Sequence, residues 1–258
     1  MKLITSRDNA LYKQLKLLAT SAQARRKAGS TLLDGVHLCQ AYLQHLGQPE
    51  WCVVCESSQH HPEITALLQQ SEQQLILADA LYQALSQVEH GVGIFFVANT
   101  PQLTLPSQLT RTSVLLDNLQ DPGNMGSLLR SAAAAGITHV FCSPGTVSAW
   151  SPKVMRAGMG AHFLMEIHEN VDLQALIGSS ELPFLATSSY ATQTVYECDL
   201  QRPVVWMFGH EGQGLSDALM NSATLQVTIP HQGAIESLNV AACAAICFFE
   251  QVRQQLQT

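Results

Sequence analysis

Charged residues are scarce in this chain of 258 residues: Asp, Glu, Lys and Arg make up 13%, whereas hydrophobic residues make up 47%. This balance excludes an intrinsically disordered protein, because such chains have too few apolar side chains to bury a core. Long hydrophobic runs are missing too. The longest, near residues 238–249, is well short of the roughly 20 residues that cross a bilayer, and the N-terminus has no apolar stretch of the signal-peptide kind. We therefore expect a soluble protein of the cytoplasm, with no membrane partner.

Regularly spaced cysteine is also absent. The seven cysteines are an odd number without a repeating interval, which favours reduced, buried thiols over a disulfide framework. Cys52 and Cys55 form a C-x-x-C with His60 and His61 nearby, so a zinc site is conceivable. There is no second cysteine pair, however, and the interval from Cys55 to His60 is not that of a zinc finger. We expect no metal, and WCVVC is interpreted as a buried strand.

Basic residues are nearly absent from the body of the chain and concentrated at its start. The net charge of −7 argues against a nucleic-acid partner, and residues 28–110 contain no Lys or Arg. The first 27 residues nevertheless hold seven of the 13 basic residues, against one acid, Asp8. These are Lys2, Arg7, Lys13, Lys16, Arg25, Arg26 and Lys27. Such a local basic footprint can bind phosphates, although the solvated face of any surface helix gives the same pattern.

Helical and strand-like segments alternate along the chain, which predicts an α/β fold with a mainly parallel sheet covered on both faces. The first helix is predicted over residues 9–28, with Asp8 or Asn9 as its cap and Gly29 at its end. Short strands and helices then follow one another as far as a helix over residues 81–87 and the strand after it.

The alternation breaks at residues 99–111, which contain two prolines, several polar residues and no clear period. We therefore expect a first domain over 1–100, a linker over 101–111 and a second domain over 112–258. The second domain closes with a predicted helix over 237–256 that is apolar nearly all round. Such a helix is expected to be buried, either in the core or at a subunit interface.

Three loops rich in glycine and polar residues follow predicted strands of the second domain, which is where ligands bind in open α/β sheets. In the first, DNLQDPGNMGSLLR, Asn124 can cap the following helix and Arg130 lies less than two helical turns later. In the second, FGHEGQGLS, glycines on both sides of Glu211 let the backbone approach a ligand closely. In the third, Ser237 and Asn239 stand where a loop becomes the closing helix and backbone N–H groups are free.

Each of these loops also has a structural explanation, such as a capped helix, a turn or a simple N-cap at Ser237. A dinucleotide site is disfavoured because the glycines from Gly209 to Gly214 come in the order G-x-x-G-x-G, which is not the order of the usual fingerprint. No acidic residue stands about 20 positions later at a strand end to bind a ribose.

Taken together, the loops resemble the signatures of the SpoU-type, TrmH-like RNA 2′-O-ribose methyltransferases of the SPOUT superfamily. The segments that carry the resemblance are LDNLQDPGNMGSLLRSAAAAG (116–136), FGHEGQGLS (208–216) and IPHQGAIESLNVAACAA (229–245), with SPKVMRAGMGAHF (151–163) between them. The N-terminal stretches SRDNALYKQLKLL and LLDGVHLCQAYL resemble the substrate-binding domain of that family, which is similar to RNA-binding ribosomal proteins. The resemblance thus extends over nearly the whole chain.

The resemblance implies a C-terminal parallel-sheet domain with a deep trefoil knot, preceded by a smaller α/β RNA-binding domain. It also implies S-adenosylmethionine as cofactor, structured RNA as substrate and a homodimer, with Arg130 or the RNA contacts completed across the interface. The implied cofactor contacts are Gly209, Glu211, Gly214, Ile229, Leu238 and Asn239. The expected RNA contacts are Lys13, Lys16, Arg25, Arg26 and Arg130.

The catalytic positions implied by the resemblance are Asn124, Arg130, Glu211, Ser237 and Asn239. Arg130 matches the residue that meets the target 2′-hydroxyl. A guanidinium keeps its proton above about pH 12, so we expect it to hold a phosphate and stabilise alkoxide charge rather than act as a base. Asn124 and Ser237 would orient Arg130 and the nucleophile, Glu211 would fix that network, and Asn239 would contact the cofactor or the loop.

The expected function is methylation of a ribose 2′-hydroxyl in structured RNA, with rRNA favoured over tRNA. One alternative is a knotted methyltransferase that acts on a base nitrogen, which Asn124, Arg130 and the sequence Ser237-Leu238-Asn239 disfavour. The other is a catalytically silent RNA-binding or ribosome-assembly factor. A pure binding protein has no need of polar residues at all five catalytic positions, so this alternative is disfavoured as well.

Overall fold

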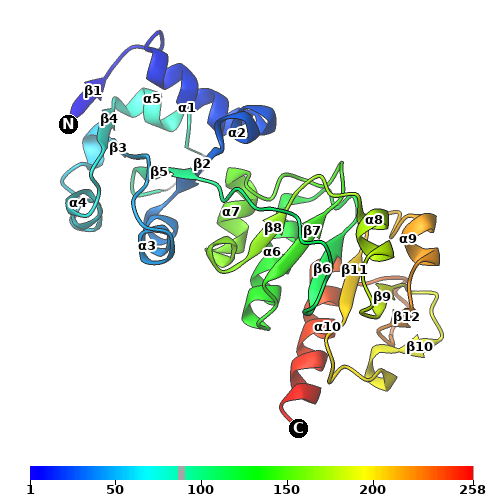
Figure 1. Ribbon diagram of the computed structural model, residues 1–258. Coiled ribbons are helices and arrows are strands. Elements are labelled where there is room, and N and C mark those ends of the chain that lie inside the picture. Colours follow the sequence, from blue (N-terminus) through cyan, green and yellow to red (C-terminus); the bar gives the residue numbers. More distant parts are fainter. Residues whose placement is uncertain (87–90, 258) are drawn as a thin grey trace. The chain divides into compact units, whose positions relative to one another are not determined.

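The structure, a computed structural model, describes residues 1–86 and 91–257, and Figure 1 traces its elements. The chain forms two compact units. The first comprises Met1–Gln102 and Trp150–Phe163, and the second comprises Leu103–Ala149 and Leu164–Thr258. None of the described helices is long and apolar enough to cross a membrane.

The first unit is built around a mixed sheet, which in the described part of the chain has the order β1-β4-β3-β5-β2. Its strands are β1 (Lys2–Ile4), β2 (Ser30–Asp34), β3 (Trp51–Cys55), β4 (Gln74–Leu77) and β5 (Ile94–Asn99). Its helices are α1 (Ala10–Thr20), α2 (Ala22–Ala28), α3 (Val36–His45), α4 (Pro62–Gln69), α5 (Asp79–Gln83) and α7 (Pro152–Gly158). β1, β4 and β3 are parallel, but β5 runs antiparallel to both β3 and β2. The expectation of a mainly parallel sheet is therefore wrong for this unit.

The helix predicted over residues 9–28 is broken at Ser21. Of the two predicted caps, Asn9 is the one that caps α1, by accepting from the backbone N–H groups of Leu11 and Tyr12. Ser21 has extended backbone angles, and its hydroxyl accepts from the N–H of Ala24, so a new helix begins there. Serine is a favoured N-cap, which explains why an otherwise helical sequence divides at this point. The helix predicted over 81–87 is the shorter α5, and residue 87 lies outside the described residues.

The second unit is a parallel sheet with the order β10-β12-β9-β11-β6-β7-β8 among the described residues. Its strands are β6 (Ser113–Leu116), β7 (His139–Cys142), β8 (Glu166–His168), β9 (Phe184–Thr187), β10 (Gln193–Thr194), β11 (Val205–Phe208) and β12 (Leu225–Thr228). Its helices are α6 (Pro122–Ala134), α8 (Leu173–Gly178), α9 (Asp217–Asn221) and α10 (Val240–Gln255). Every pairing is parallel, so the predicted α/β fold with a parallel sheet is confirmed here. The knot implied by the resemblance stays a prediction.

The two faces of this sheet bury alternate residues of its central strands, as a strand period of two requires. Met207 of β11 belongs to the apolar cluster that α8 and α9 help to form. Trp206 faces the other way, where its ring and that of Phe208 lie against Phe248 of α10. α10 packs along α6 on this face (Figure 1). The strand ends that these helices flank are the positions at which ligands bind in parallel sheets.

Both helices that border the motif loops begin at other residues than predicted. α6 starts at Pro122, inside the expected loop, because Asp121 is the N-cap and accepts from the N–H of Asn124. Asn124 is thus in the first turn of the helix rather than its cap. α10 starts at Val240, with Asn239 instead of Ser237 as the N-cap. Phe249 of this helix is 47% exposed, so the second unit alone does not cover the helix on all sides.

Candidate functional site

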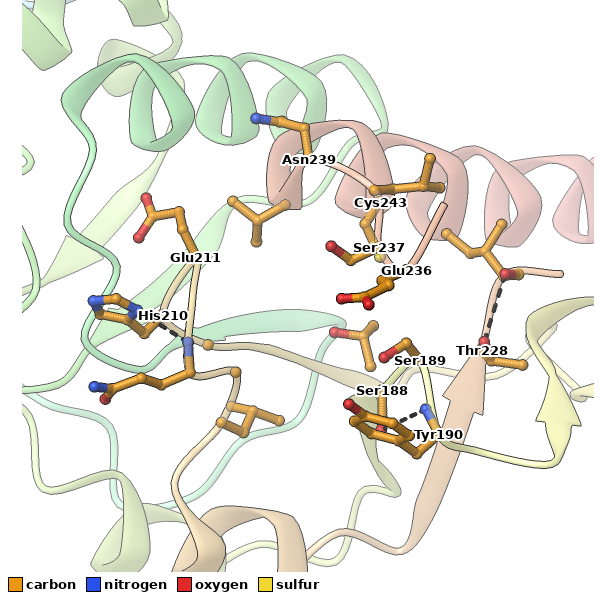
Figure 2. A pocket seen from close by; sticks show the side chains of 18 of the residues that line it. Ser188, Ser189, Tyr190, His210, Glu211, Thr228, Glu236, Ser237, Asn239 and Cys243 are labelled. Carbon is orange, nitrogen blue, oxygen red and sulfur yellow. Dashed lines mark hydrogen bonds between the residues drawn. The ribbon is translucent and has the colours of Figure 1, made fainter. Parts of the chain in front are cut away.

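A cavity of about 600 Å³ lies at the carboxyl ends of β9, β11 and β12 in the second unit. Its lining comes from the loops after these three strands, from the segment before α10 and from the first turns of that helix (Figure 2). Because parallel strands end at the same edge of a sheet, residues far apart in sequence meet here. The volume is in the range of small-molecule and cofactor sites.

The loop after β11 closes on itself through its backbone. The N–H of His210 donates to the carbonyl of Gly214 at 2.9 Å, and the N–H of Gly214 donates back to the carbonyl of His210 at 2.8 Å. A Cβ atom at Gly209 would lie 2.1 Å from the carbonyl carbon of Gly214, so only glycine fits there. Gly214 has a φ of +73°, which glycine adopts without strain. The loop thus presents bare backbone to the cavity.

His210 is fixed in one tautomer by its own loop. Its Nδ1 accepts from the backbone N–H groups of Gly212 at 2.9 Å and Gln213 at 3.2 Å. A neutral imidazole that accepts at Nδ1 carries its proton on Nε2. In this tautomer His210 has an N–H donor at Nε2.

Glu211 joins the loop after β11 to the start of α6. Its Oε1 accepts from the N–H of Asp121 at 2.9 Å and from Nδ2 of Asn124 at 3.0 Å, and its Oε2 accepts from the N–H of Gln120 at 3.1 Å. Partial burial alone raises the pKa of Glu211, but these hydrogen bonds to the charged form outweigh it and lower the pKa below its usual value. Glu211 is therefore held as a carboxylate.

Asn124 extends this network to the last motif. Its Oδ1 accepts from Nδ2 of Asn239 at 2.8 Å, while its own Nδ2 donates to Glu211. Oδ1 of Asn239 accepts from the N–H groups of Ala241 and Ala242 and so caps α10. The chain Glu211–Asn124–Asn239 ties all three motif loops together with side chains alone.

Most of the predicted site residues meet at the cavity. Asn124, Glu211, Ser237 and Asn239 line it, and so do the remaining predicted cofactor contacts, which are Gly209, Gly214, Ile229 and Leu238. Arg130 does not line it. Its side chain is exposed on α6, about 9 Å along the helix axis from Asn124, and it makes no hydrogen bond or ion pair with the residues that the structure describes.

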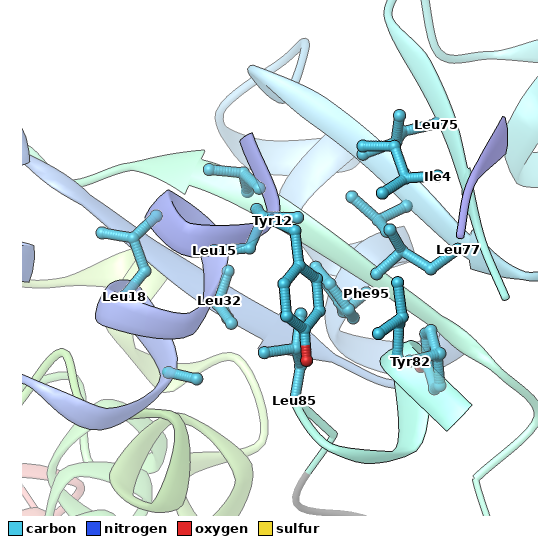
Figure 3. Close-up of a cluster of buried hydrophobic side chains, with 14 of the residues drawn as sticks. Ile4, Tyr12, Leu15, Leu18, Leu32, Leu75, Leu77, Tyr82, Leu85 and Phe95 are labelled. Atoms are coloured by element: carbon cyan, nitrogen blue, oxygen red, sulfur yellow. The ribbon is translucent and has the colours of Figure 1, made fainter. Parts of the chain in front are cut away.

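The predicted RNA contacts in the first unit differ in exposure. Tyr12, Leu15 and Leu18 of α1 point into the core (Figure 3), which leaves Lys13 and Lys16 exposed on the outer side of the helix. Lys13 forms an exposed ion pair with Asp8 at 3.2 Å, and Arg26 is exposed on α2. Arg25, by contrast, is 7% exposed and donates from Nη1 to the carbonyl of Leu18 at 2.8 Å. The break at Ser21 turns Arg25 back onto α1, so its guanidinium is not on the basic surface.

Sequence reasoning missed several residues of the cavity. β9 ends at Thr187, and the three residues that follow it, Ser188, Ser189 and Tyr190, line the cavity although they belong to none of the predicted motifs. A signal was available, because these polar residues follow a buried strand at its carboxyl end. Glu236 of the last motif also lines the cavity. No group of three or more His, Cys, Asp or Glu residues in the described part of the chain could hold a metal ion.

Known sequences resemble the chain over nearly its whole length. The model of the SpoU rRNA Methylase family matches residues 111–249. An uncharacterized tRNA/rRNA methyltransferase of Synechocystis sp. is 34% identical, and the aligned part covers 98% of this chain and 94% of the relative. The 23S rRNA (guanosine(2553)-2′-O)-methyltransferase RlmP of Bacillus subtilis is 29% identical over 96% of this chain and 98% of its own length.

Solved structures agree with these relatives. The crystal structure of an RNA 2′-O ribose methyltransferase matches with a TM-score of 0.82 at 31% identity, covering 99% of this chain and 100% of that one. The SpoU methyltransferase AviRb of Streptomyces viridochromogenes, in complex with the cofactor AdoMet, shares the fold with a TM-score of 0.88 at 24% identity, covering 96% and 98%. As its loop motifs predicted, the chain belongs to the SpoU rRNA methylase family.

Proposed function

We propose that this enzyme transfers the methyl group of S-adenosylmethionine to a ribose 2′-hydroxyl of rRNA. The observation that carries the proposal is the chain Glu211–Asn124–Asn239, which joins three loop motifs beside a cavity of about 600 Å³. The similarity to RlmP and to a solved RNA 2′-O ribose methyltransferase supports the ribose as the target. tRNA is the second candidate substrate, since the Synechocystis relative is described as a tRNA/rRNA methyltransferase.

The cavity suits a cofactor that is held mainly by backbone groups. Gly209 and Gly214 present no side chain, and Leu238 and Ile229 add apolar surface. When bound, S-adenosylmethionine supplies a methyl carbon on a positively charged sulfur. The lining offers hydrogen-bond donors and acceptors on several sides, including the Nε2–H of His210 and the hydroxyl of Ser237.

Glu211 and Asn124 position the site rather than exchange protons. A carboxylate that accepts three hydrogen bonds and has a lowered pKa is a poor proton acceptor near neutral pH. Its role is to hold the start of α6 and the amide of Asn124 in one orientation. Methyl transfer requires the attacking oxygen, the methyl carbon and the sulfur in line, so fixed geometry supplies much of the rate.

Arg130 binds the RNA next to the reacting ribose. Its guanidinium stays charged at physiological pH, is exposed and is engaged by none of the described residues. It holds the phosphate adjacent to the target and stabilises the charge that develops on the 2′-oxygen. Asn239 and Ser237 lie at the start of α10 and hold the loop that faces the cofactor.

The first domain, residues 1–100, binds the RNA. A linker over 101–111 joins it to the knotted methyltransferase domain over 112–258. The enzyme acts in the cytoplasm. Lys13, Lys16 and Arg26 form its phosphate-binding surface. Replacing these three with Gln should lower RNA affinity and flatten its salt dependence while leaving cofactor affinity unchanged. RNA affinity at low salt that matches the wild type would contradict this assignment.

The enzyme acts as a homodimer through the outer face of α10, so that Arg130 or the RNA contacts are completed by the partner. Phe249 of this helix is 47% exposed, and Leu256, which directly follows the helix two turns later, is 81% exposed; exposed Ala242 and half-buried Ile246 continue the same stripe. An exposed apolar stripe at this spacing is typical of a helix that packs against a second copy. Phe249→Glu is therefore expected to halve the mass measured by light scattering, and an unchanged mass would contradict the interface.

A transfer assay tests the proposed activity directly. The protein is incubated with tritiated S-adenosylmethionine and total RNA from a strain that lacks the gene, and label in rRNA and tRNA is counted. We expect label in rRNA from the wild type and little from Arg130→Ala or Asn124→Ala. Equal label from wild type and Arg130→Ala would refute the catalytic assignment, and label in tRNA alone would replace rRNA as substrate.

A further inference from the structure

The Asp, Glu, Lys and Arg residues that line the cavity are all acidic. Of the lining residues, none is Lys or Arg, and the two carboxylates are Glu211 and Glu236. Glu211 accepts three hydrogen bonds, from Asn124 and from the backbone before α6. Glu236 is therefore the carboxylate of this lining whose charge is left for a ligand.

Glu236 is in a position to meet a ligand. It lies in the exposed segment between β12 and α10, beside Ser237, and Figure 2 shows both side chains in the space between the loop after β9 and the loop after β11. Across the cavity stand the hydroxyl groups of Ser188 and Ser189. Within residues 1–86 and 91–257, Glu236 forms no ion pair and no hydrogen bond.

The methyl donor and the product of the reaction differ in one feature that a carboxylate detects. S-Adenosylmethionine carries a positive charge on its sulfur, whereas S-adenosylhomocysteine, which remains after methyl transfer, has a neutral thioether. The adenosine, the carboxylate and the amino group of the two molecules are the same. Backbone contacts to those common parts bind both molecules alike, whereas a negative charge near the sulfur favours the donor alone.

We propose that Glu236 makes this cavity prefer the cationic methyl donor over the neutral product. This inference rests on the proposed function and makes Glu236 a specificity-determining residue of the reaction. The mechanism is a direct charge–charge attraction that exists before transfer and disappears with it. Release of the product is thereby favoured in the same step that consumes the donor.

The size of the effect follows from the exposure of Glu236. The attraction between two opposite unit charges about 4 Å apart raises the affinity of a ligand by a factor of roughly five when the surroundings are as polar as water. In a less polar site the factor is larger. Since Glu236 is exposed in the structure, we expect a factor of about five to ten. Added salt should reduce it, because solvent-accessible charges are screened.

Calorimetry with three ligands tests the proposal on the full-length protein. S-Adenosylmethionine and sinefungin both carry a positive charge at or beside the sulfur position, and S-adenosylhomocysteine does not. Glu236→Gln keeps the shape of the side chain and removes its charge. The Kd values for the two cationic ligands should rise about five- to tenfold, while that for S-adenosylhomocysteine stays within about twofold of the wild type.

Two further variants test whether the effect comes from the charge of Glu236. Glu181→Gln removes an exposed carboxylate that does not line the cavity, and it should change none of the three Kd values. Glu236→Asp keeps the charge on a shorter side chain, so it should retain part of the preference. Thermal unfolding of each variant checks that the fold is intact.

Three results would overturn the proposal. Equal weakening of all three ligands would mean that Glu236 holds the common amino group or merely the loop. Unchanged Kd values would mean that it faces no ligand charge. Unchanged Kd values with a lower kcat and an altered pH profile would assign it to proton transfer instead. If the wild type binds neither S-adenosylmethionine nor S-adenosylhomocysteine, the proposed function itself fails, which is a distinct result.

Discussion

Replacement of Gly209 by alanine should weaken cofactor binding strongly, while the nearby replacement Gly212→Ala should change it little. A Cβ at Gly209 would lie 2.1 Å from the carbonyl carbon of Gly214 and 2.2 Å from the backbone nitrogen of Leu215. The obstacle is backbone, so no side chain can move aside. The loop must open, which breaks the two hydrogen bonds between His210 and Gly214 at the cavity wall.

The magnitude can be worked out from these contacts. Each backbone hydrogen bond contributes about 0.5–1.5 kcal/mol, and forcing an extra methyl group into a packed site costs about 1–3 kcal/mol. We therefore expect a loss of about 2–6 kcal/mol in the free energy of cofactor binding, which raises Kd by a factor of about 30 or more. At Gly212 the nearest atom to a Cβ is Cε1 of His210 at 3.7 Å, an ordinary contact.

Titration calorimetry with S-adenosylmethionine compares the two variants under the same conditions. Gly212→Ala keeps the N–H that donates to His210, and its Kd should remain within a few-fold of the wild type. The reasoning would be refuted if Gly209→Ala bound the cofactor as tightly as Gly212→Ala.

Three further predictions concern hydrogen bonds and burial. In the wild type, Nδ2 of Asn124 lies 3.0 Å from Oε1 of Glu211, so Asn124→Asp sets a second carboxylate against Glu211. Asn124→Asp should therefore lower kcat in the transfer assay more than Asn124→Ala does. The reverse order would contradict the network. Burial lowers the pKa of His168, so in acid the folded state binds fewer protons than the unfolded state. The contribution of His168 to the free energy of unfolding should be constant above about pH 6.5 and fall below that pH, by at most about 1.4 kcal/mol per pH unit. Chemical denaturation of His168→Phe at several pH values should lack this part of the slope. Gln251→Met leaves the buried indole N–H of Trp206 without its 2.9 Å acceptor and should cost about 1–3 kcal/mol in urea unfolding, whereas a midpoint equal to the wild type would show that the bond is unimportant.

The parts of the fold that follow from local pattern could be predicted from the sequence. The parallel sheet of the second unit shows in its alternation of strands and helices, and Asn9 caps its helix as expected. The antiparallel course of β5 could not be predicted, because strand direction depends on pairing partners far away in the sequence. The break at Ser21 has a local cause that was overlooked, namely a serine able to cap a new helix inside an apolar stripe.

The site could be predicted as a set of residues but not as an arrangement. Asn124, Glu211 and Asn239 were identified from their motifs, yet their mutual hydrogen bonds depend on loops about a hundred residues apart. The burial of Arg25 could not be predicted either, because it depends on the turn between two helices and not on the charge pattern. The loop after β9 was not predicted, because Ser188 and Ser189 belong to none of the motifs from which the site was inferred.

The central claim is that this protein methylates ribose, and nucleoside analysis of its product tests that claim most directly. rRNA from a strain that lacks the gene is treated with the purified protein and S-adenosylmethionine, digested to nucleosides and analysed by mass spectrometry with fragmentation at the glycosidic bond. The account predicts a new methyl group that stays with the sugar fragment, with much less of it after treatment with Asn124→Ala. A new methyl group on the base fragment, or none in rRNA at all, would contradict it.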